Sequence, residues 1–179
     1  NFNIFGRIQR TFGKIRASLN TSFNYSKINQ FVQGEQSLNE SFTQSFTPGV
    51  RTNFRVAPNV SLRYVYRVVQ NNLGGRDTEF IIKSPSIDFD AYFMKKFTFI
   101  TKYSYTVQDT ETTSQSFQNW DAQLLYRKEK DAKWEFELKM TNILNIDSQV
   151  RTSANTISVL NSETFIQPRF ITLRVVYNL

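Results

Sequence analysis

The chain of 179 residues, long enough for one domain with a sizeable core, contains neither cysteine nor histidine and has a net charge of +7. The missing residue types exclude a disulfide framework, thiolate metal sites and histidine-based catalysis. Aromatic residues make up 15% of the chain, with only 6 glycines and 4 prolines, which favours strands over disorder. The 22 basic residues are spread along the whole chain, so we expect no nucleic-acid partner.

Apolar and polar residues alternate along most of the chain, and no comparable segment shows the helical period. We predict nine strands, at residues 2–10, 13–30, 39–56, 59–71, 79–93, 97–109, 116–127, 133–143 and 164–179. Most exceed the roughly 5–6 residues usual in globular sheets, and they reach the ~9–11 residues with which a tilted strand crosses a bilayer. The sequence therefore predicts an all-β protein with strands of transmembrane length.

The predicted connections alternate in length. Short links are expected at 10–14, 56–59, 94–96 and 128–132, and longer polar links at 31–38, 72–78, 110–115 and 144–163. Short turns at one end and long loops at the other are typical of outer-membrane barrels, in which the short turns are periplasmic. The segments 31–38, 72–78 and 144–163 are thus candidates for a ligand-binding mouth.

Two of the short turns also predict strand register. Centring one hairpin on Lys95 places Phe93 opposite Phe97 and Asp88 opposite Lys102. Centring another on Lys130 places Tyr126 opposite Trp134, Leu124 opposite Phe136, and Asp121 opposite Lys139. Both registers pair apolar residues on one face and opposite charges on the other, as stable cross-strand pairs require. We therefore predict the ion pairs Asp88–Lys102 and Asp121–Lys139.

The alternation alone is compatible with two kinds of barrel. A soluble, lipocalin-like barrel holds a ligand in an apolar lumen, whereas a membrane barrel turns its apolar face to lipid and its polar face to the lumen. The many charges on the polar face, the aromatic residues near strand ends and the sorted connections favour the membrane barrel. The residues predicted to face the lumen are Arg16, Arg51, Arg55, Arg63, Arg67, Asp88, Lys102, Asp121, Lys139 and Arg174.

No group of residues suggests catalysis, a metal or a cofactor. Asp88 and Asp90 share one face, as a catalytic carboxylate pair would, but a lumen network of ion pairs with Lys102 and nearby arginines explains them better. The acids of segment 109–113 lack the spacing of a calcium loop. We therefore expect no enzymatic activity and no cofactor.

The number of predicted strands suggests a larger barrel. If the C-terminus is periplasmic, an odd count places Asn1 on the extracellular side, whereas single-chain bacterial barrels have even counts with both ends in the periplasm. We therefore expect residues 1–179 to be one barrel segment that forms the C-terminal part of a larger barrel.

The last forty residues carry a family resemblance. Asn142, Ile143, Leu144 and Asn145 precede a long segment, then Pro168 and Arg169, and then a final strand that ends on Tyr177 and Leu179. This arrangement resembles the C-terminal end of TonB-dependent outer-membrane receptors of the type abundant in Bacteroidetes. In that family the final strand carries the outer-membrane assembly signal, here Tyr177 and Leu179, although the last residue there is usually aromatic.

The resemblance implies a barrel of about 22 strands around a plug domain, with TonB as partner and nutrient uptake as activity. Residues 1–179 contain no counterpart of the plug or of the TonB-contacting box. The resemblance also implies location in the bacterial outer membrane, in contact with its lipid, with a periplasmic C-terminus. The alternative is a barrel that transports nothing and serves as a scaffold for a surface lipoprotein, for secretion partners or for other outer-membrane subunits.

Overall fold

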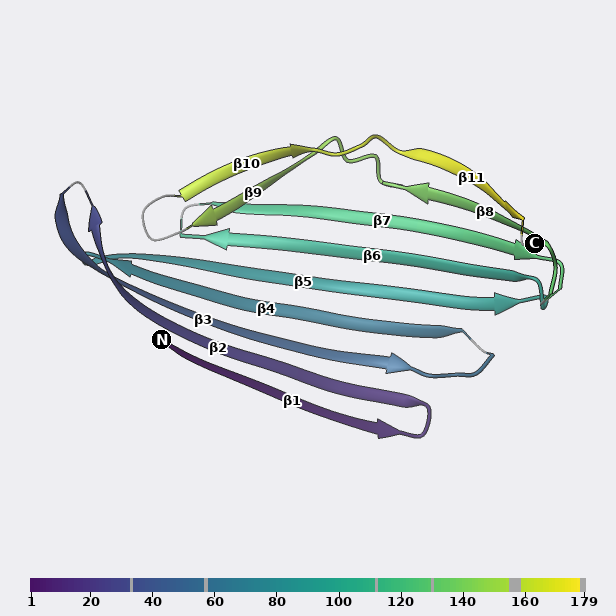
Figure 1. Cartoon of the computed structure of the whole chain (residues 1–179), viewed down its shortest axis with the longest axis horizontal. Helices are drawn as coiled ribbons and strands as arrows, with labels where there is room; N and C mark the ends of the chain where they lie inside the picture. The colour runs from purple at the N-terminus through teal and green to yellow at the C-terminus, as the bar shows by residue number, and fades with distance from the viewer. Residues whose placement is uncertain (33, 57, 112, 130, 155–158, 178–179) are drawn as a thin grey trace.

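The computed structural model of the chain describes residues 1–32, 34–56, 58–111, 113–129, 131–154 and 159–177. Their strands are β1 (Phe2–Phe12), β2 (Ile15–Val32), β3 (Glu35–Thr52), β4 (Asn59–Leu73), β5 (Arg76–Phe93), β6 (Phe97–Thr110), β7 (Ser114–Arg127), β8 (Trp134–Thr141), β9 (Ser148–Ala154), β10 (Val159–Phe165) and β11 (Phe170–Tyr177). Nine of them form one antiparallel sheet in the order β1-β2-β3-β4-β5-β6-β7-β8-β11, as Figure 1 shows. The predicted all-β antiparallel architecture is confirmed.

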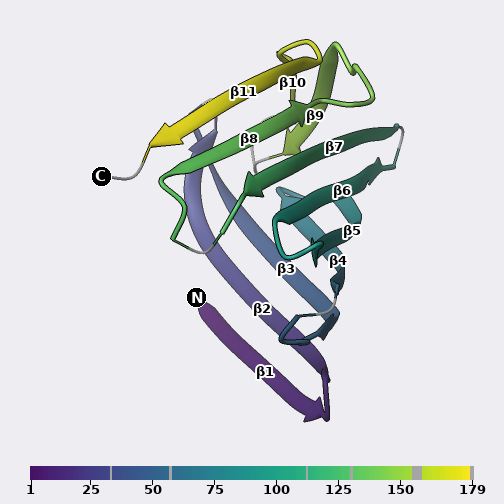
Figure 2. The same ribbon diagram turned by 90° about the vertical axis from the view of Figure 1, so that its right-hand side faces the viewer.

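The sheet is a single curved layer that does not close on itself (Figure 2). In the described residues, β1 and β11 each have one strand neighbour in this sheet, so each leaves one edge unpaired. Val68 and Phe80 are the buried hydrophobic residues of the described chain. Such a sheet has no hydrophobic core of its own, and its apolar side chains must be covered by something outside this layer.

The predicted contrast between short and long connections is largely wrong. The segments 31–38 and 72–78 belong mostly to strands, because β2 extends to Val32, β3 begins at Glu35, and β4 and β5 meet at Gly74 and Gly75. These two glycines have φ values of 57° and 84°, the left-handed conformations that a two-residue hairpin turn needs. Strand extensions therefore take the place of two expected loops.

The predicted long segment 144–163 contains a hairpin. β9 and β10 pair antiparallel from Ser148 opposite Phe165 to Ala154 opposite Val159, outside the main sheet. The final strand begins at Phe170 rather than at residue 164. It pairs with β8, and its end lies at the same end of the sheet as the β1–β2, β3–β4, β5–β6 and β7–β8 connections (Figure 1).

One of the two predicted registers is confirmed. Phe93 lies opposite Phe97 and Asp88 opposite Lys102. The register of β7 and β8 differs from the prediction by two residues, so that Tyr126 lies opposite Phe136 and Gln123 opposite Lys139. A shift of two residues keeps every side chain on its predicted face, because the side-chain period of a strand is two. The pattern of faces thus left this register undetermined.

Candidate functional site

The registers divide the side chains of the main sheet into two faces. One row that follows directly opposed residues runs through Ala17, Val50, Leu62, Ile87, Tyr103 and Trp120 on β2 to β7. A second row runs through Phe99, Leu124, Leu138 and Leu173. We call the side that carries these rows the apolar face. Many of its large side chains are exposed; Ile8 and Leu173, for example, are 72% and 67% exposed.

Aromatic residues form a ladder on the apolar face near the end where β5–β6 and β7–β8 turn. Phe93 stacks on Phe97 with ring centroids 5.4 Å apart, Phe97 lies 5.0 Å from Tyr126, and Tyr126 lies 6.2 Å from Phe136. Aromatic rings at the ends of an apolar band are typical of the water–lipid interface, where an apolar ring meets a hydrated layer. The arrangement agrees with the aromatic residues that the sequence predicts near strand ends.

Beyond the apolar rows, toward the opposite end of the sheet, the same face becomes polar. The Nζ of Lys27 lies 2.6 Å from the Oε1 of Glu40, directly opposite on β3, and the hydroxyl of Tyr25 donates to the same oxygen at 3.1 Å. These hydrogen bonds, with Lys27 as the main cause, hold the pKa of the Glu40 carboxyl below its ordinary value. Charged groups at this end remain hydrated, so the apolar band ends before the strands do.

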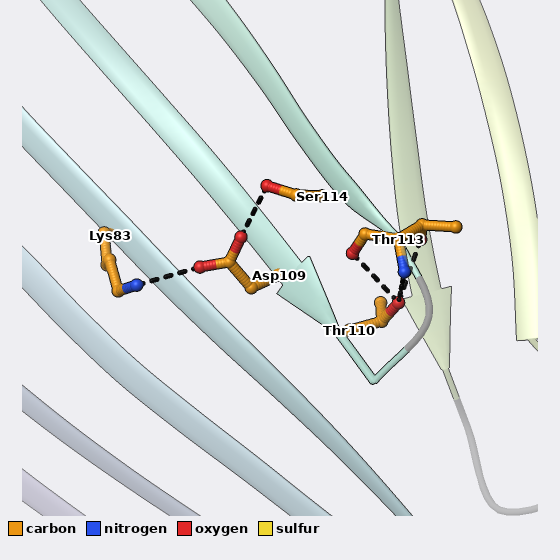
Figure 3. A network of polar contacts seen from close by, with 5 residues as sticks. All are labelled: Lys83, Asp109, Thr110, Thr113 and Ser114. Atoms are coloured by element: carbon orange, nitrogen blue, oxygen red, sulfur yellow. Dashed lines mark hydrogen bonds and ion pairs between the residues drawn. The ribbon is translucent and has the colours of Figure 1, made fainter.

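A second polar network lies at the β6–β7 end of the strands (Figure 3). The Nζ of Lys83 lies 2.8 Å from the Oδ2 of Asp109, and the Ser114 hydroxyl donates to the other carboxylate oxygen at 2.6 Å. In the adjoining turn, the Thr110 hydroxyl accepts a hydrogen bond from the backbone N–H of Thr113 at 2.9 Å. The ion pair thus joins the middle of β5 to the end of β6, and the hydrogen bonds of Ser114 and Thr113 join the end of β6 to the start of β7.

The opposite side of the sheet, which we call the polar face, carries nine of the ten residues predicted to line a lumen. The register places Arg16, Arg51, Arg63, Arg67, Asp88, Lys102, Asp121, Lys139 and Arg174 on it. Arg55 is the exception, because β3 ends at Thr52 and Arg55 lies in the connection to β4. The Asn59 side chain fixes that connection by accepting a hydrogen bond from the Phe54 N–H at 2.7 Å.

Charged residues of the polar face share a row across the strands. Arg16 lies opposite Arg51, Arg51 opposite Ser61, Ser61 opposite Asp88, Asp88 opposite Lys102, and Lys102 opposite Asp121. Neither predicted ion pair forms among the described residues. Asp121 instead accepts hydrogen bonds at both oxygens, one of them from the Asn142 N–H at 3.0 Å, and Lys139 lies two residues out of the expected register.

The ion pair that does form on β8 and β11 joins Glu137 to Arg174, which lies directly opposite. Glu137 is 9% exposed, so its carboxylate is largely removed from water. The sequence identified Arg174 as a polar-face residue but gave no partner for it. Alternation identifies Glu137 as a residue of the same face, and only the β8–β11 register shows that the two are neighbours.

The segment that carries the family resemblance forms a compact junction between β8 and β11. Asn142 and Asn145 both have positive φ, of 50° and 56°, a conformation that asparagine tolerates better than most residues. The Asn142 side chain donates to the carbonyls of Ile146 at 2.8 Å and Gln167 at 3.0 Å, and it accepts from the Ile146 N–H at 2.9 Å. The Asn145 side chain accepts from the Arg169 N–H at 3.2 Å. The two asparagines therefore join both ends of the segment that contains the β9–β10 hairpin.

Of the two predicted assembly-signal residues, Tyr177 lies at the end of β11, and Leu179 lies outside the described residues. The Tyr177 ring lies 4.8 Å from the ring of Trp134, its opposite neighbour on β8, and the Lys133 ammonium lies 5.9 Å from the same ring. Tyr177 is thus part of the apolar face at the aromatic end.

Among the residues that the structure describes, no cluster of three or more acidic side chains could hold a metal ion. No helix there is long and apolar enough to span a membrane.

No protein-family profile matches the sequence, and no curated protein has significant sequence similarity to it. The chain resembles a solved structure, "OmpT (in-vitro folded), an outer membrane protein of Vibrio cholerae", with a TM-score of 0.55 and 10% sequence identity. The match covers 98% of this chain and 55% of that chain, so this chain spans about half the length of its structural neighbour. The chain therefore has the fold of part of an outer-membrane β-barrel protein.

Proposed function

We propose that the chain forms part of the wall of a bacterial outer-membrane β-barrel, and that this barrel belongs to a TonB-dependent receptor for nutrient uptake. The apolar face contacts lipid, and the polar face lines the lumen. The observation that carries the proposal is a single-layer sheet with one exposed apolar face and one charged face. In water, an apolar face of this extent would drive aggregation, whereas in a bilayer it is the stable arrangement.

The unpaired edges of β1 and β11 support a larger barrel. An open edge in the hydrocarbon region leaves backbone N–H and C=O groups without partners, and each such group costs about 2–7 kcal/mol. Further strands must therefore pair with both edges, and the family resemblance suggests about 22 strands in total. In this proposal the C-terminus lies in the periplasm with the β1–β2, β3–β4, β5–β6 and β7–β8 turns.

The orientation of the faces can be tested with adjacent residues of β7. Gln123 belongs to the polar face and Leu124 to the apolar face. The chain has no cysteine, so single substitutions Gln123→Cys and Leu124→Cys give one labelling site each. We expect a fluorophore at residue 124 to be quenched by brominated lipid in proteoliposomes, and one at residue 123 to be quenched by aqueous iodide. Equal lipid quenching at both positions, or recovery of the protein in the soluble fraction, would contradict the barrel.

TonB dependence needs a separate experiment. The full-length protein, purified in detergent, is mixed with the purified periplasmic domain of TonB. We expect retention of that domain by the intact protein and loss of retention when the segment preceding the barrel is deleted. A protein that assembles in the outer membrane but never retains TonB would contradict the receptor while leaving the barrel intact.

A scaffold function is favoured by one observation. The segments 31–38 and 72–78, expected to be longer polar links, belong mostly to paired strands, and the ion pairs Lys27–Glu40 and Lys83–Asp109 join neighbouring strands. Such a rigid polar rim suits the docking of a surface lipoprotein or another outer-membrane subunit. Co-purification of a partner that is lost when Glu40 and Asp109 are both replaced by Lys would favour this function.

A further inference from the structure

Four arginines surround a hollow on the polar face of strands β1 to β4. Its volume is ≈ 340 Å³, and its lining includes Arg7, Arg16, Arg51 and Arg63 together with Ser18 and Ser61. We call this hollow the arginine groove. Its volume is within the range of about 300–1,000 Å³ that is usual for small-molecule sites.

The strand register explains how the arginines come together. Arg16 and Arg51 are directly opposite, whereas Arg63 lies opposite Gly49 one row further along. Gly49 has no side chain, and a Cβ there would lie 3.2 Å from the Ser18 hydroxyl oxygen. Since neighbouring strands are about 4.8 Å apart, arginines on β2 and β4 are roughly 10 Å apart at the backbone, and their long side chains can reach one common anion. Because Gly49 has no side chain, the surface of β3 between these arginines stays uncovered.

The groove has no internal counter-charge. Its lining contains no Asp or Glu, and none of the four arginines belongs to an ion pair among the described residues. The contact that the structure gives Arg7 is with the neutral amide oxygen of Gln9, at 2.9 Å. Like charges directly opposite each other destabilise a sheet, so the Arg16–Arg51 pair favours an anion between the two guanidinium groups.

We propose that the arginine groove binds a small anionic solute that carries a phosphate group or two or more carboxylates. Guanidinium groups recognise these oxyanions through paired N–H donors, and three or four of them around one hollow give both charge and geometric selectivity. The site rests on the proposed function, because the polar face must line a water-filled lumen for a solute to reach it. The groove would then concentrate anions on one side of the barrel interior.

The matched test compares two arginines on one face of one strand. Arg63 lines the groove, whereas Arg67, four residues along β4, does not. Titration calorimetry of the full-length protein in detergent, with citrate and with inorganic phosphate as separate probes, measures the affinity of each form. We expect saturable binding of at least one probe, weakened about tenfold or more by Arg63→Gln or Arg51→Gln, and little changed by Arg67→Gln. Added NaCl should also weaken it.

Every other result contradicts the proposal. Absence of saturable binding to a protein that shows the heat-modifiable migration of a folded barrel would overturn this inference alone. Equal losses with Arg63→Gln and Arg67→Gln would mean non-specific attraction to the face. Lowered thermal stability of the groove variants without any anion binding would mean that the arginines hold an acidic segment of the protein instead. A protein without barrel migration would overturn the proposed function and this site together.

Discussion

Arg174 on the last strand forms an ion pair with Glu137, the directly opposed residue of β8. The pair is asymmetric, because the Glu137 side chain is 11% exposed and that of Arg174 is 61% exposed. Removal of the arginine would leave a largely buried carboxylate without its counter-charge, whereas removal of both charges would leave two neutral amides. Comparing the single and the double neutralisation therefore separates the Arg174–Glu137 attraction from the cost of burying the Glu137 charge.

We predict that Arg174→Gln destabilises the barrel by about 1–2 kcal/mol and that Arg174→Gln combined with Glu137→Gln recovers most of this loss. The measurement is the thermal midpoint of the heat-modifiable band on a gel. Lys139→Gln is the matched control, because Lys139 lies opposite the neutral Thr172 on the same two strands. A double variant less stable than the single one would show that the amides pack worse than the ion pair.

Asn142 supports a second prediction, which separates backbone conformation from hydrogen bonding. Alanine loses both the side-chain bonds to Ile146 and Gln167 and the tolerance for a φ of 50°, whereas glycine loses the bonds alone. We expect Asn142→Ala to destabilise the barrel by about 2–4 kcal/mol and Asn142→Gly by roughly 1–2 kcal/mol less than that. Equal effects in thermal unfolding would mean that the hydrogen bonds alone account for the junction.

The faces of the sheet could be predicted from the sequence because a strand repeats every two residues. That period places Arg16 and Asp88 on one face whether or not a particular register is known. The register of β7 and β8 could not be predicted in the same way, because moving Lys139 from Asp121 to Gln123 leaves both faces unchanged. In the structure, the bond from the Asn142 N–H to Asp121 accompanies the observed register.

The strand tips could not be predicted for a different reason. Around Ser37 and Asn72 polar residues dominate both faces, so alternation does not distinguish strand from loop there. Their strand conformation depends on backbone pairing with a neighbour, which the local sequence does not reveal. The β9–β10 hairpin escaped prediction in the same way. The arginine groove was missed as a site because its residues come from four strands, and Gly49 carries no sequence signal for an uncovered surface.

The Lys27–Glu40 pair gives a pH prediction. The folded-state pKa of Glu40 lies below its ordinary value, so its ion pair adds stability above the unfolded-state pKa. That stability is lost as the pH falls through the lower, folded-state pKa. We expect the thermal midpoint of the wild type to fall more between about pH 7 and pH 3 than that of Glu40→Gln. Glu163→Gln, on the β9–β10 hairpin, is the control and should follow the wild type. The difference in thermal midpoint should be small, because the side chains of Lys27 and Glu40 are both exposed. Identical acid profiles for the wild type, Glu40→Gln and Glu163→Gln would contradict the prediction.

Assembly in the outer membrane should depend on the end of the last strand. The tilted rings of Tyr177 and Trp134 are in contact at the aromatic end of the apolar face, and Leu179 has the same parity along the sequence. In the resembled family these positions form the assembly signal, which requires apolar side chains. We predict that Leu179→Lys reduces the amount of heat-modifiable barrel in the outer-membrane fraction several-fold. Val176→Lys should be far milder, because Val176 lies opposite Glu135 on the polar face, which in the proposed barrel lines a hydrated lumen. If Leu179→Lys assembles at wild-type yield while Val176→Lys fails, the assignment of the two faces is reversed, and the lipid-facing interpretation fails with it.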